Sequence, residues 1–321
     1  MNSTMKGIFP VAIVIFLSWF LPSGLHADPR IDELVAKVEE SLKAGRLSDA
    51  ETQAQQMVKY AQEKLGDNDK QAIRARILLA NVYREAGKYE AAASLIQYCV
   101  AANEKAFGPD DPALIEPLAA LGILLQVQNK LPEAEATFRR ALAIDANKRS
   151  NDRSPIVEIK ESLALLRAGE GDLPQSAQLL EEVLTERERE ASTNTEEYAT
   201  TLNNLASIYA QQERYDEAIV LQDKALRVLK DAVGQDNLTN ALFSQNMAGF
   251  LLLAGRKNEA EQVLAIVPPL LEKHLGSDHP ALSEVLLELA ELNQQLGNSA
   301  KAKELRNKAM EVQKNAVQKT Q

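Results

Sequence analysis

Apolar residues recur every three or four positions in paired stretches of the chain, most clearly between positions 198 and 238. The apolar positions are Tyr198, Leu202, Leu205 and Tyr209 in the first stretch, and Ala218, Leu221, Ala225 and Val228 in the second. This spacing puts the apolar side chains of each stretch on one face of a helix. The polar segment 212–216 separates the two stretches. The pattern therefore predicts two amphipathic helices joined by a tight turn.

The same helix pair recurs with a period of 42 residues. The turn positions at this period are Gly45, Gly87, Asn129, Gly171, Glu213, Gly255 and Gly297, and five residues later come Ala50, Ala92, Ala134, Ser176, Ala218, Ala260 and Ala302. Glycine suits this turn because it readily adopts the left-handed conformation that ends a helix. A fixed period of this length is typical of a solenoid.

The repeats are expected to fill the chain from Asp28 to its end. The expected limits are approximately 28–70, 71–112, 113–155, 156–197, 198–238, 239–280 and 281–321. The predicted fold is an all-α solenoid of about seven helix-turn-helix units. We expect a set of small residues to let the two helices of each unit approach closely; these are Ala80, Gly122, Ala164, Ala206, Ala248 and Ala290.

Two repeats depart from the pattern. Pro268 and Pro269 fall inside the second helix of the sixth repeat, where proline removes a backbone hydrogen bond, and we expect a kink there. The last helix has a single apolar stripe and is otherwise polar; the stripe is Ala302, Leu305, Ala309, Val312 and Ala316. A polar outer face suits a capping element, because the end of a solenoid has no neighbour to cover it.

The first 27 residues have the pattern of a secretory signal peptide. Lys6 precedes an apolar run from Ile8 to Leu21, and a segment of mainly small residues ends at Ala27. We expect cleavage after Ala27, which makes the protein periplasmic or secreted. The apolar run is shorter than the roughly 20 residues that span a bilayer as a helix. An uncleaved N-terminal membrane anchor is the alternative.

Composition narrows the functional classes. The formal net charge is −10, which disfavours a nucleic-acid partner. Cys99 is the only cysteine and occupies a position where other repeats have alanine, so we expect a buried, unreactive thiol. His274 and His279 have no partners at metal-ligand spacing. No phosphate-binding loop or catalytic motif is present, and we expect no cofactor, no metal and no enzymatic activity. Asn237 opens a glycosylation sequon, which matters only in a eukaryotic host.

The repeat residues resemble those of a known family. The segment 201–209, Thr-Leu-Asn-Asn-Leu-Ala-Ser-Ile-Tyr, together with 215–218, Tyr-Asp-Glu-Ala, resembles the 42-residue tetratricopeptide repeat of kinesin light chains. The linkers 107–112 and 275–280 match the same subclass. HEAT and armadillo repeats share the period but do not predict this signature of turn and alanine.

The resemblance implies a right-handed superhelix whose first helices line a concave, partner-binding groove. The groove positions that it implies are Asn81 and Arg84 in the second repeat, Asn203, Asn204 and Ser207 in the fifth, Asn246 in the sixth, and Glu284 and Glu288 in the seventh. For any one of these residues, a polar side chain that merely faces solvent is the competing interpretation.

The charge of the groove predicts its preference. Chaperone-binding members of the family hold a terminal carboxylate with basic residues and asparagine, whereas this chain has Glu284 and Glu288 after Asn246. We therefore expect no carboxylate capture by the last three repeats, and a preference for neutral or basic segments.

These features predict an exported, non-enzymatic scaffold or adaptor that binds a protein or peptide partner. The alternative is an auxiliary or regulatory subunit of a cell-envelope enzyme or of a secretion or assembly complex. A stand-alone enzyme ranks third because no catalytic constellation is visible.

Overall fold

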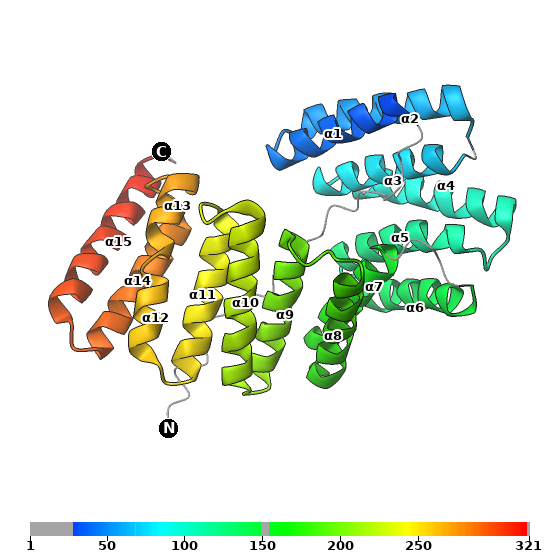
Figure 1. Cartoon of the computed structure of the whole chain (residues 1–321). Helices are drawn as coiled ribbons and strands as arrows, with labels where there is room; N and C mark the ends of the chain where they lie inside the picture. Colours follow the sequence, from blue (N-terminus) through cyan, green and yellow to red (C-terminus); the bar gives the residue numbers. More distant parts are fainter. Residues whose placement is uncertain (1–27, 68, 149–153, 320–321) are drawn as a thin grey trace. The chain divides into compact units, whose positions relative to one another are not determined.

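The computed structural model describes residues 28–67, 69–148 and 154–319, so the expected signal peptide lies outside the described residues. The described residues form helices and contain no strand (Figure 1). They divide into two compact units, and the division falls after Leu166, inside α7. We call these the N-terminal unit and the C-terminal unit and describe each by itself.

The N-terminal unit consists of α1 (Pro29–Lys43), α2 (Leu47–Leu65), α3 (Lys70–Glu85), α4 (Tyr89–Phe107), the short 3₁₀ helix η1 (Pro112–Leu114), α5 (Ile115–Val127), α6 (Leu131–Asn147) and most of α7 (Ser154–Gly169). The C-terminal unit contains α8 (Leu173–Arg189), α9 (Glu196–Gln211), α10 (Tyr215–Val233), α11 (Leu238–Leu253), α12 (Lys257–Leu264), α13 (Val267–Leu275), α14 (Pro280–Gln295) and α15 (Ser299–Lys319). Within the units, consecutive helices pack against each other, as α9 does on α10 and α14 on α15. The predicted all-α architecture of helix pairs is confirmed.

A residue in the left-handed conformation ends the first helix of a pair. Gly87 has a φ of 71°, and the next N–H, that of Lys88, donates to the carbonyl oxygen of Tyr83 at 2.8 Å. This hydrogen bond satisfies a carbonyl group that the helix end would otherwise leave unpaired. Glu213 adopts the same conformation without glycine, with a φ of 63°. There the Arg214 guanidinium stacks 3.6 Å from the centroid of the Tyr209 ring, which helps to hold the turn.

The core of each repeat is built on small residues. All seven residues that stand five positions after a turn, from Ala50 to Ala302, are fully buried. Gly122 shows why the helices need such residues, because a Cβ atom there would lie within 2.8 Å of three ring atoms of Phe138. Cys99 is also fully buried, and burial raises the pKa of its thiol to about 12. The burial confirms Cys99 as a buried packing residue, and the raised pKa disfavours the reactive thiolate.

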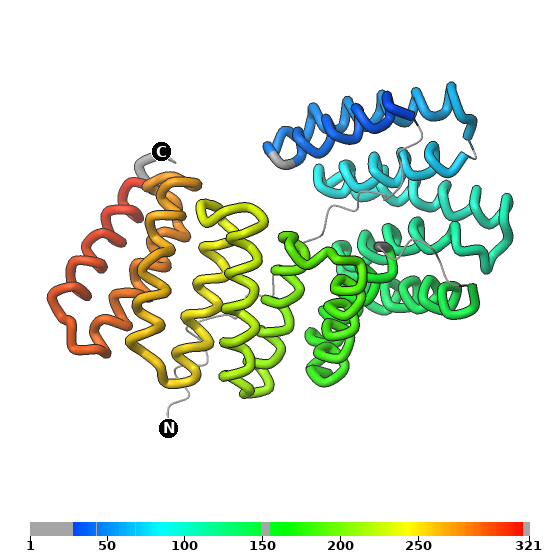
Figure 2. The backbone as a smooth tube through the Cα atoms, viewed as in Figure 1, coloured from blue at the N-terminus to red at the C-terminus, as the bar shows by residue number. Residues whose placement is uncertain are grey.

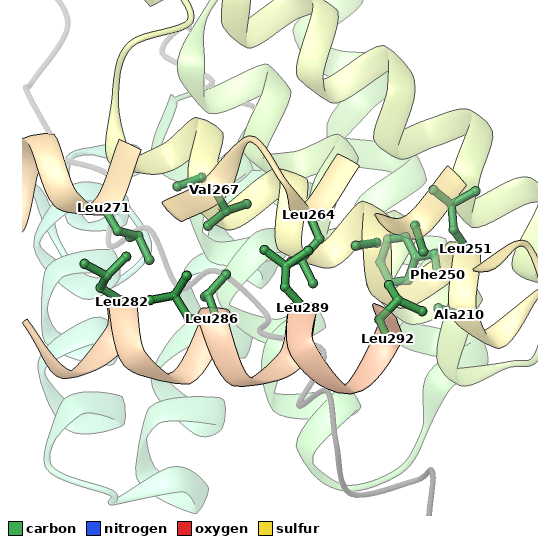
Figure 3. Packing of buried hydrophobic residues seen from close by; sticks show 14 of the residues in the cluster. Ala210, Phe250, Leu251, Leu264, Val267, Leu271, Leu282, Leu286, Leu289 and Leu292 are labelled. Carbon is green, nitrogen blue, oxygen red and sulfur yellow. The ribbon is translucent and has the colours of Figure 1, made fainter. Parts of the chain in front are cut away.

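The sixth repeat has a divided second helix where a kink was expected. The helix ends at Leu264 and resumes at Val267 (Figure 2). Pro268 stands in the first turn of the new helix, where its missing N–H costs no hydrogen bond. Leu264, Val267 and Leu271 all remain buried and face the leucines of α14 (Figure 3). The break thus accommodates proline without loss of the apolar contact with the next repeat.

Candidate partner-binding face

Side chains on the first helices of the last three repeats are linked from one helix to the next. Asn246 of α11 donates to Oδ1 of Asn203 of α9 at 2.9 Å. The Gln245 side chain hydrogen-bonds the carboxyl group of Glu288 on α14. Each link joins residues 43 positions apart, one repeat plus one residue. We call Asn204, Gln245, Asn246, Glu284, Leu287 and Glu288 the α9–α11–α14 face.

Asn203 is the centre of a buried amide network beneath this face. Its Oδ1 accepts hydrogen bonds from Asn246 and from Nε2 of Gln222, both at 2.9 Å. Gln222 Nε2 also donates to the carbonyl oxygen of Phe243 at 2.8 Å. Gln222 and Asn203 are both 0% exposed. The network therefore ties α9, α10 and α11 together.

Gln222 is not among the residues expected from the sequence, although the repeat contains a signal for it. At the equivalent positions other repeats have Ile96, Phe138, Leu180 and Leu264, and all four are buried. A buried amide at an apolar position is costly unless its groups are hydrogen-bonded. Here Nε2 is paired, whereas Oε1 is buried without a partner. Gln222 thus keeps a polar group in the core at some cost and holds Asn203 in place.

The structure gives the expected groove residues of the fifth and sixth repeats unequal exposure. Asn203 and Ser207 are fully buried, and the Ser207 hydroxyl donates to the carbonyl oxygen of Asn203 at 2.9 Å. These two residues support the face from below rather than forming its surface. Asn204 and Asn246 are each 5% exposed, so only a small part of each residue is accessible to a partner.

The seventh repeat supplies the open part of the face. Glu284 is exposed, Glu288 is partly buried, and Leu287 between them is 41% exposed. The pKa of Glu288 is raised to about 7, first by burial and then by the negative charge of Glu284, while the hydrogen bond from Gln245 opposes the shift. One oxygen of Glu288, Oε2, is buried without a hydrogen-bond partner. Neither glutamate forms an ion pair with another described residue.

Asn81 and Arg84, the expected groove residues of the second repeat, lie on α3 in the N-terminal unit. They are 7% and 6% exposed. The Arg84 guanidinium pairs with the neighbouring Glu85 at 2.9 Å, and Nδ2 of Asn81 is buried without a partner. These two residues belong to the other unit and are not part of the α9–α11–α14 face. Their role in partner binding stays a prediction.

The part of the chain that the structure describes holds no group of three histidine, cysteine or acidic side chains able to bind a metal. His274 lies 2.8 Å from Asp236, and His279 accepts a hydrogen bond from the N–H of Ala281 at the start of α14. None of the described helices combines the length and apolar character needed to cross a membrane.

Comparison with known proteins identifies the repeats. Three family models, each described as tetratricopeptide repeat, match residues 156–231, 73–113 and 115–140. The chain is a tetratricopeptide-repeat protein. Its repeats are of the kinesin light chain-like type, as expected from the sequence. Kinesin light chain-related protein 2 of Arabidopsis thaliana is 24% identical over 238 residues, which cover 73% of this chain and 35% of the plant protein. The tetratricopeptide chain thus spans about a third of the length of the curated relatives that it matches.

Solved structures share the fold. BtubC (BKLC) from P. vanneervenii superposes with a TM-score of 0.57 and 22% identity, covering 76% of this chain and 92% of that one. The Rap conjugation gene regulator of the plasmid pLS20, solved in complex with the Phr* peptide, has a TM-score of 0.56 and 14% identity, with 96% and 82% of the two chains covered. At these identities the likeness concerns the tetratricopeptide fold alone.

Proposed function

We propose that this tetratricopeptide-repeat protein is an exported, non-enzymatic scaffold or adaptor that binds a neutral or basic segment of a partner protein on the α9–α11–α14 face. The tetratricopeptide fold itself indicates a protein–protein interaction scaffold. The Rap regulator, which shares the fold, was solved with a bound peptide. Export rests on the signal-like pattern that ends at Ala27.

One observation carries the choice of face. Leu287 is exposed between two glutamates that have no cationic partner among the described residues. On α11, a buried amide network holds Asn246 in place, and the adjacent Gln245 hydrogen-bonds Glu288. An exposed apolar side chain beside unpaired charge and fixed amides offers a partner both burial and directional hydrogen bonds. The formal charge of the face favours a neutral or basic segment.

In-cell crosslinking of the tagged protein, followed by mass spectrometry, tests the face. We compare the wild type with Leu287→Lys and with the matched control Val220→Lys, since Val220 is a 67% exposed aliphatic residue on α10. Both variants gain one charge, and thermal unfolding checks that both remain folded. The proposal expects partners that the wild type and Val220→Lys capture and Leu287→Lys loses. Identical partners from both variants contradict the proposed face.

Two further readouts test the remaining parts of the proposal. N-terminal sequencing of the exported protein is expected to begin at Asp28, and an intact Met1 would contradict cleavage. The number of partners separates the scaffold from the alternative role. A scaffold is captured with several partners, whereas an auxiliary subunit is captured in one stoichiometric complex.

A further inference from the structure

Glu288 is an unusual carboxylate within its own unit. Nearby acidic residues have cationic partners, as Glu261 has Lys301 at 2.5 Å and Glu272 has Lys308 at 3.0 Å. Glu288 has only the neutral Gln245 and an oxygen that is buried without a partner. A buried, ionised carboxylate in such surroundings is costly. Glu288 is therefore expected to take up a proton or to find a cation outside the chain.

The elements around Glu288 supply no cation to it. Helix α11 contains no charged residue from Leu238 to Leu253. Several charged groups of the remaining packed elements are paired elsewhere; these are Glu261 on α12 with Lys301, Glu272 on α13 with Lys308, Lys273 and His274 on α13 with Asp236, and Glu291 on α14 with Arg306. Only Glu284, one helical turn away, acts on Glu288 through its charge, and it disfavours ionisation.

We propose that Glu288 is a proton-controlled acceptor for one lysine or arginine side chain of the partner. In the protonated form the carboxyl group stays against Gln245 and presents no charge. In the ionised form the carboxylate turns to the exposed side of α14, where it and Glu284 bind the cationic group of the partner's lysine or arginine. Leu287 contacts the apolar stem of that lysine or arginine. This inference rests on the proposed function, because it takes the α9–α11–α14 face as the binding surface.

The proton linkage has a defined sign. A cation that binds only the ionised form releases the proton from Glu288, so binding strengthens as the pH rises. With a pKa of about 7, the ionised fraction falls about tenfold from pH 8 to pH 6, and the apparent dissociation constant rises by about the same factor. The face should therefore bind basic segments at pH 8 and release them at pH 6.

The test uses the full chain and a pentalysine peptide with both ends blocked. The carboxyl carbon of Glu288 is followed by NMR through a pH titration, with and without the peptide, and the affinity is measured at pH 6 and pH 8. Glu288→Gln is compared with Glu304→Gln, because Glu304 is an exposed residue of α15 and its substitution makes the same change in net charge. Pentaserine with blocked ends serves as the uncharged peptide.

We expect the Glu288 midpoint near neutral pH to fall when pentalysine is added. The apparent affinity should drop about tenfold from pH 8 to pH 6 in the wild type and in Glu304→Gln, and should be weak and independent of pH in Glu288→Gln. Equal binding and equal pH dependence of the two variants would overturn the inference, as would the absence of pentalysine binding to the wild type. Partner loss in Leu287→Lys with no effect of Glu288→Gln would refute the acceptor alone and leave the proposed face intact.

Discussion

The N-terminal and C-terminal units link the first helices of successive repeats with different chemistry. In the N-terminal unit, Arg74 of α3 and Glu116 of α5 form an ion pair 2.9 Å long, with 19% and 13% of their side chains exposed. In the C-terminal unit the corresponding links are made by amides, between Asn203 and Asn246 and between Gln245 and Glu288. One unit thus neutralises its carboxylate internally, whereas the other leaves a carboxylate without a cation.

The 42-residue period allows the residues of the two units to be compared at equivalent positions. Glu284 stands at the position equivalent to Glu116, four periods later. Arg74 lies one repeat before Glu116, whereas Leu242 lies one repeat before Glu284. The missing arginine explains why the acidic pair on α14 has no cationic partner from the previous repeat. In the N-terminal unit this position forms an ion pair, whereas in the C-terminal unit Glu284 has no cationic partner among the described residues, as the proposed binding role requires.

The largest expected effect comes from the core of the N-terminal unit. Gly122→Ala should destabilise this unit by about 1–3 kcal/mol, because the added methyl group overlaps the fully buried Phe138 ring. Urea unfolding and hydrogen exchange of α5 and α6 measure the change. Gly169→Ala is the control, since its methyl group meets nothing within 4 Å, and it should be neutral or stabilising by up to about 1 kcal/mol. Equal stability of the two variants would contradict the close contact.

Breaking the Arg74–Glu116 pair tests the chemistry of the N-terminal unit. Arg74→Leu should cost about 2 kcal/mol of unfolding free energy, because it leaves Glu116 largely buried without this cation. The double variant Arg74→Leu, Glu116→Leu should recover most of the loss, since apolar residues can replace a buried ion pair. Urea unfolding measures the free energy of both variants. If the double variant is no more stable than Arg74→Leu, the loss of this cation beside Glu116 does not cause the destabilisation.

An arginine introduced at position 242 should give the acidic pair of the C-terminal unit a cation like the one that Arg74 provides to Glu116 in the N-terminal unit. In Leu242→Arg the new cation stands one repeat before Glu284, and the midpoint of Glu288 should fall by about one pH unit. The pH dependence of pentalysine binding should weaken with it. Leu242→Gln is the uncharged control. An unchanged Glu288 midpoint in Leu242→Arg would show that the repeat position does not set the electrostatics of the face.

The stability of the C-terminal unit should depend on the ionisation of Glu288. Its pKa is raised from an ordinary value of 4.5 to about 7, so the folded state binds the proton more tightly than the unfolded state. The stabilisation is therefore fully present below pH 4.5 and is lost as the pH rises through 7. Glu288→Gln should stabilise the unit by about 1 kcal/mol at pH 8, after allowance for partial exposure, and by nothing at pH 4. Glu304→Gln should show no such pH-dependent gain in urea unfolding.

The sequence predicted the features that depend on the period. The turn at Glu213 and the fully buried Ala218 follow from the 42-residue period. The break near Pro268 follows from the missing backbone N–H of proline. The burial of Asn203 did not follow, because the amide that pairs with it, Gln222, is contributed by another helix. The raised pKa of Glu288 did not follow either, because it comes first from burial, which depends on how the helices pack, and only then from the charge of Glu284. A position-by-position comparison of repeats would have identified Gln222, since leucine, isoleucine or phenylalanine occupies most of its equivalents.

The smallest expected effect on stability concerns Gln222 itself. Gln222→Leu introduces the residue found at the equivalent Leu180 and removes a buried amide whose Oε1 has no partner, so stability should change by less than about 1 kcal/mol. Asn203 would lose one of its two donors, and we expect weaker partner capture with altered NMR signals of the Asn203 and Asn246 side-chain amides.

The reverse substitution separates the two roles of the buried glutamine. Leu180→Gln places an amide at a fully buried position of a repeat that has Glu161, not Asn203, at the equivalent position. It should cost about 2 kcal/mol, because the amide is buried without the same network. A loss of more than about 2 kcal/mol in Gln222→Leu would mean that the network holds the fold rather than the face. Unchanged stability with lost partner capture would instead identify Gln222 as a residue that positions Asn246 for binding, retained in the core although leucine would pack there.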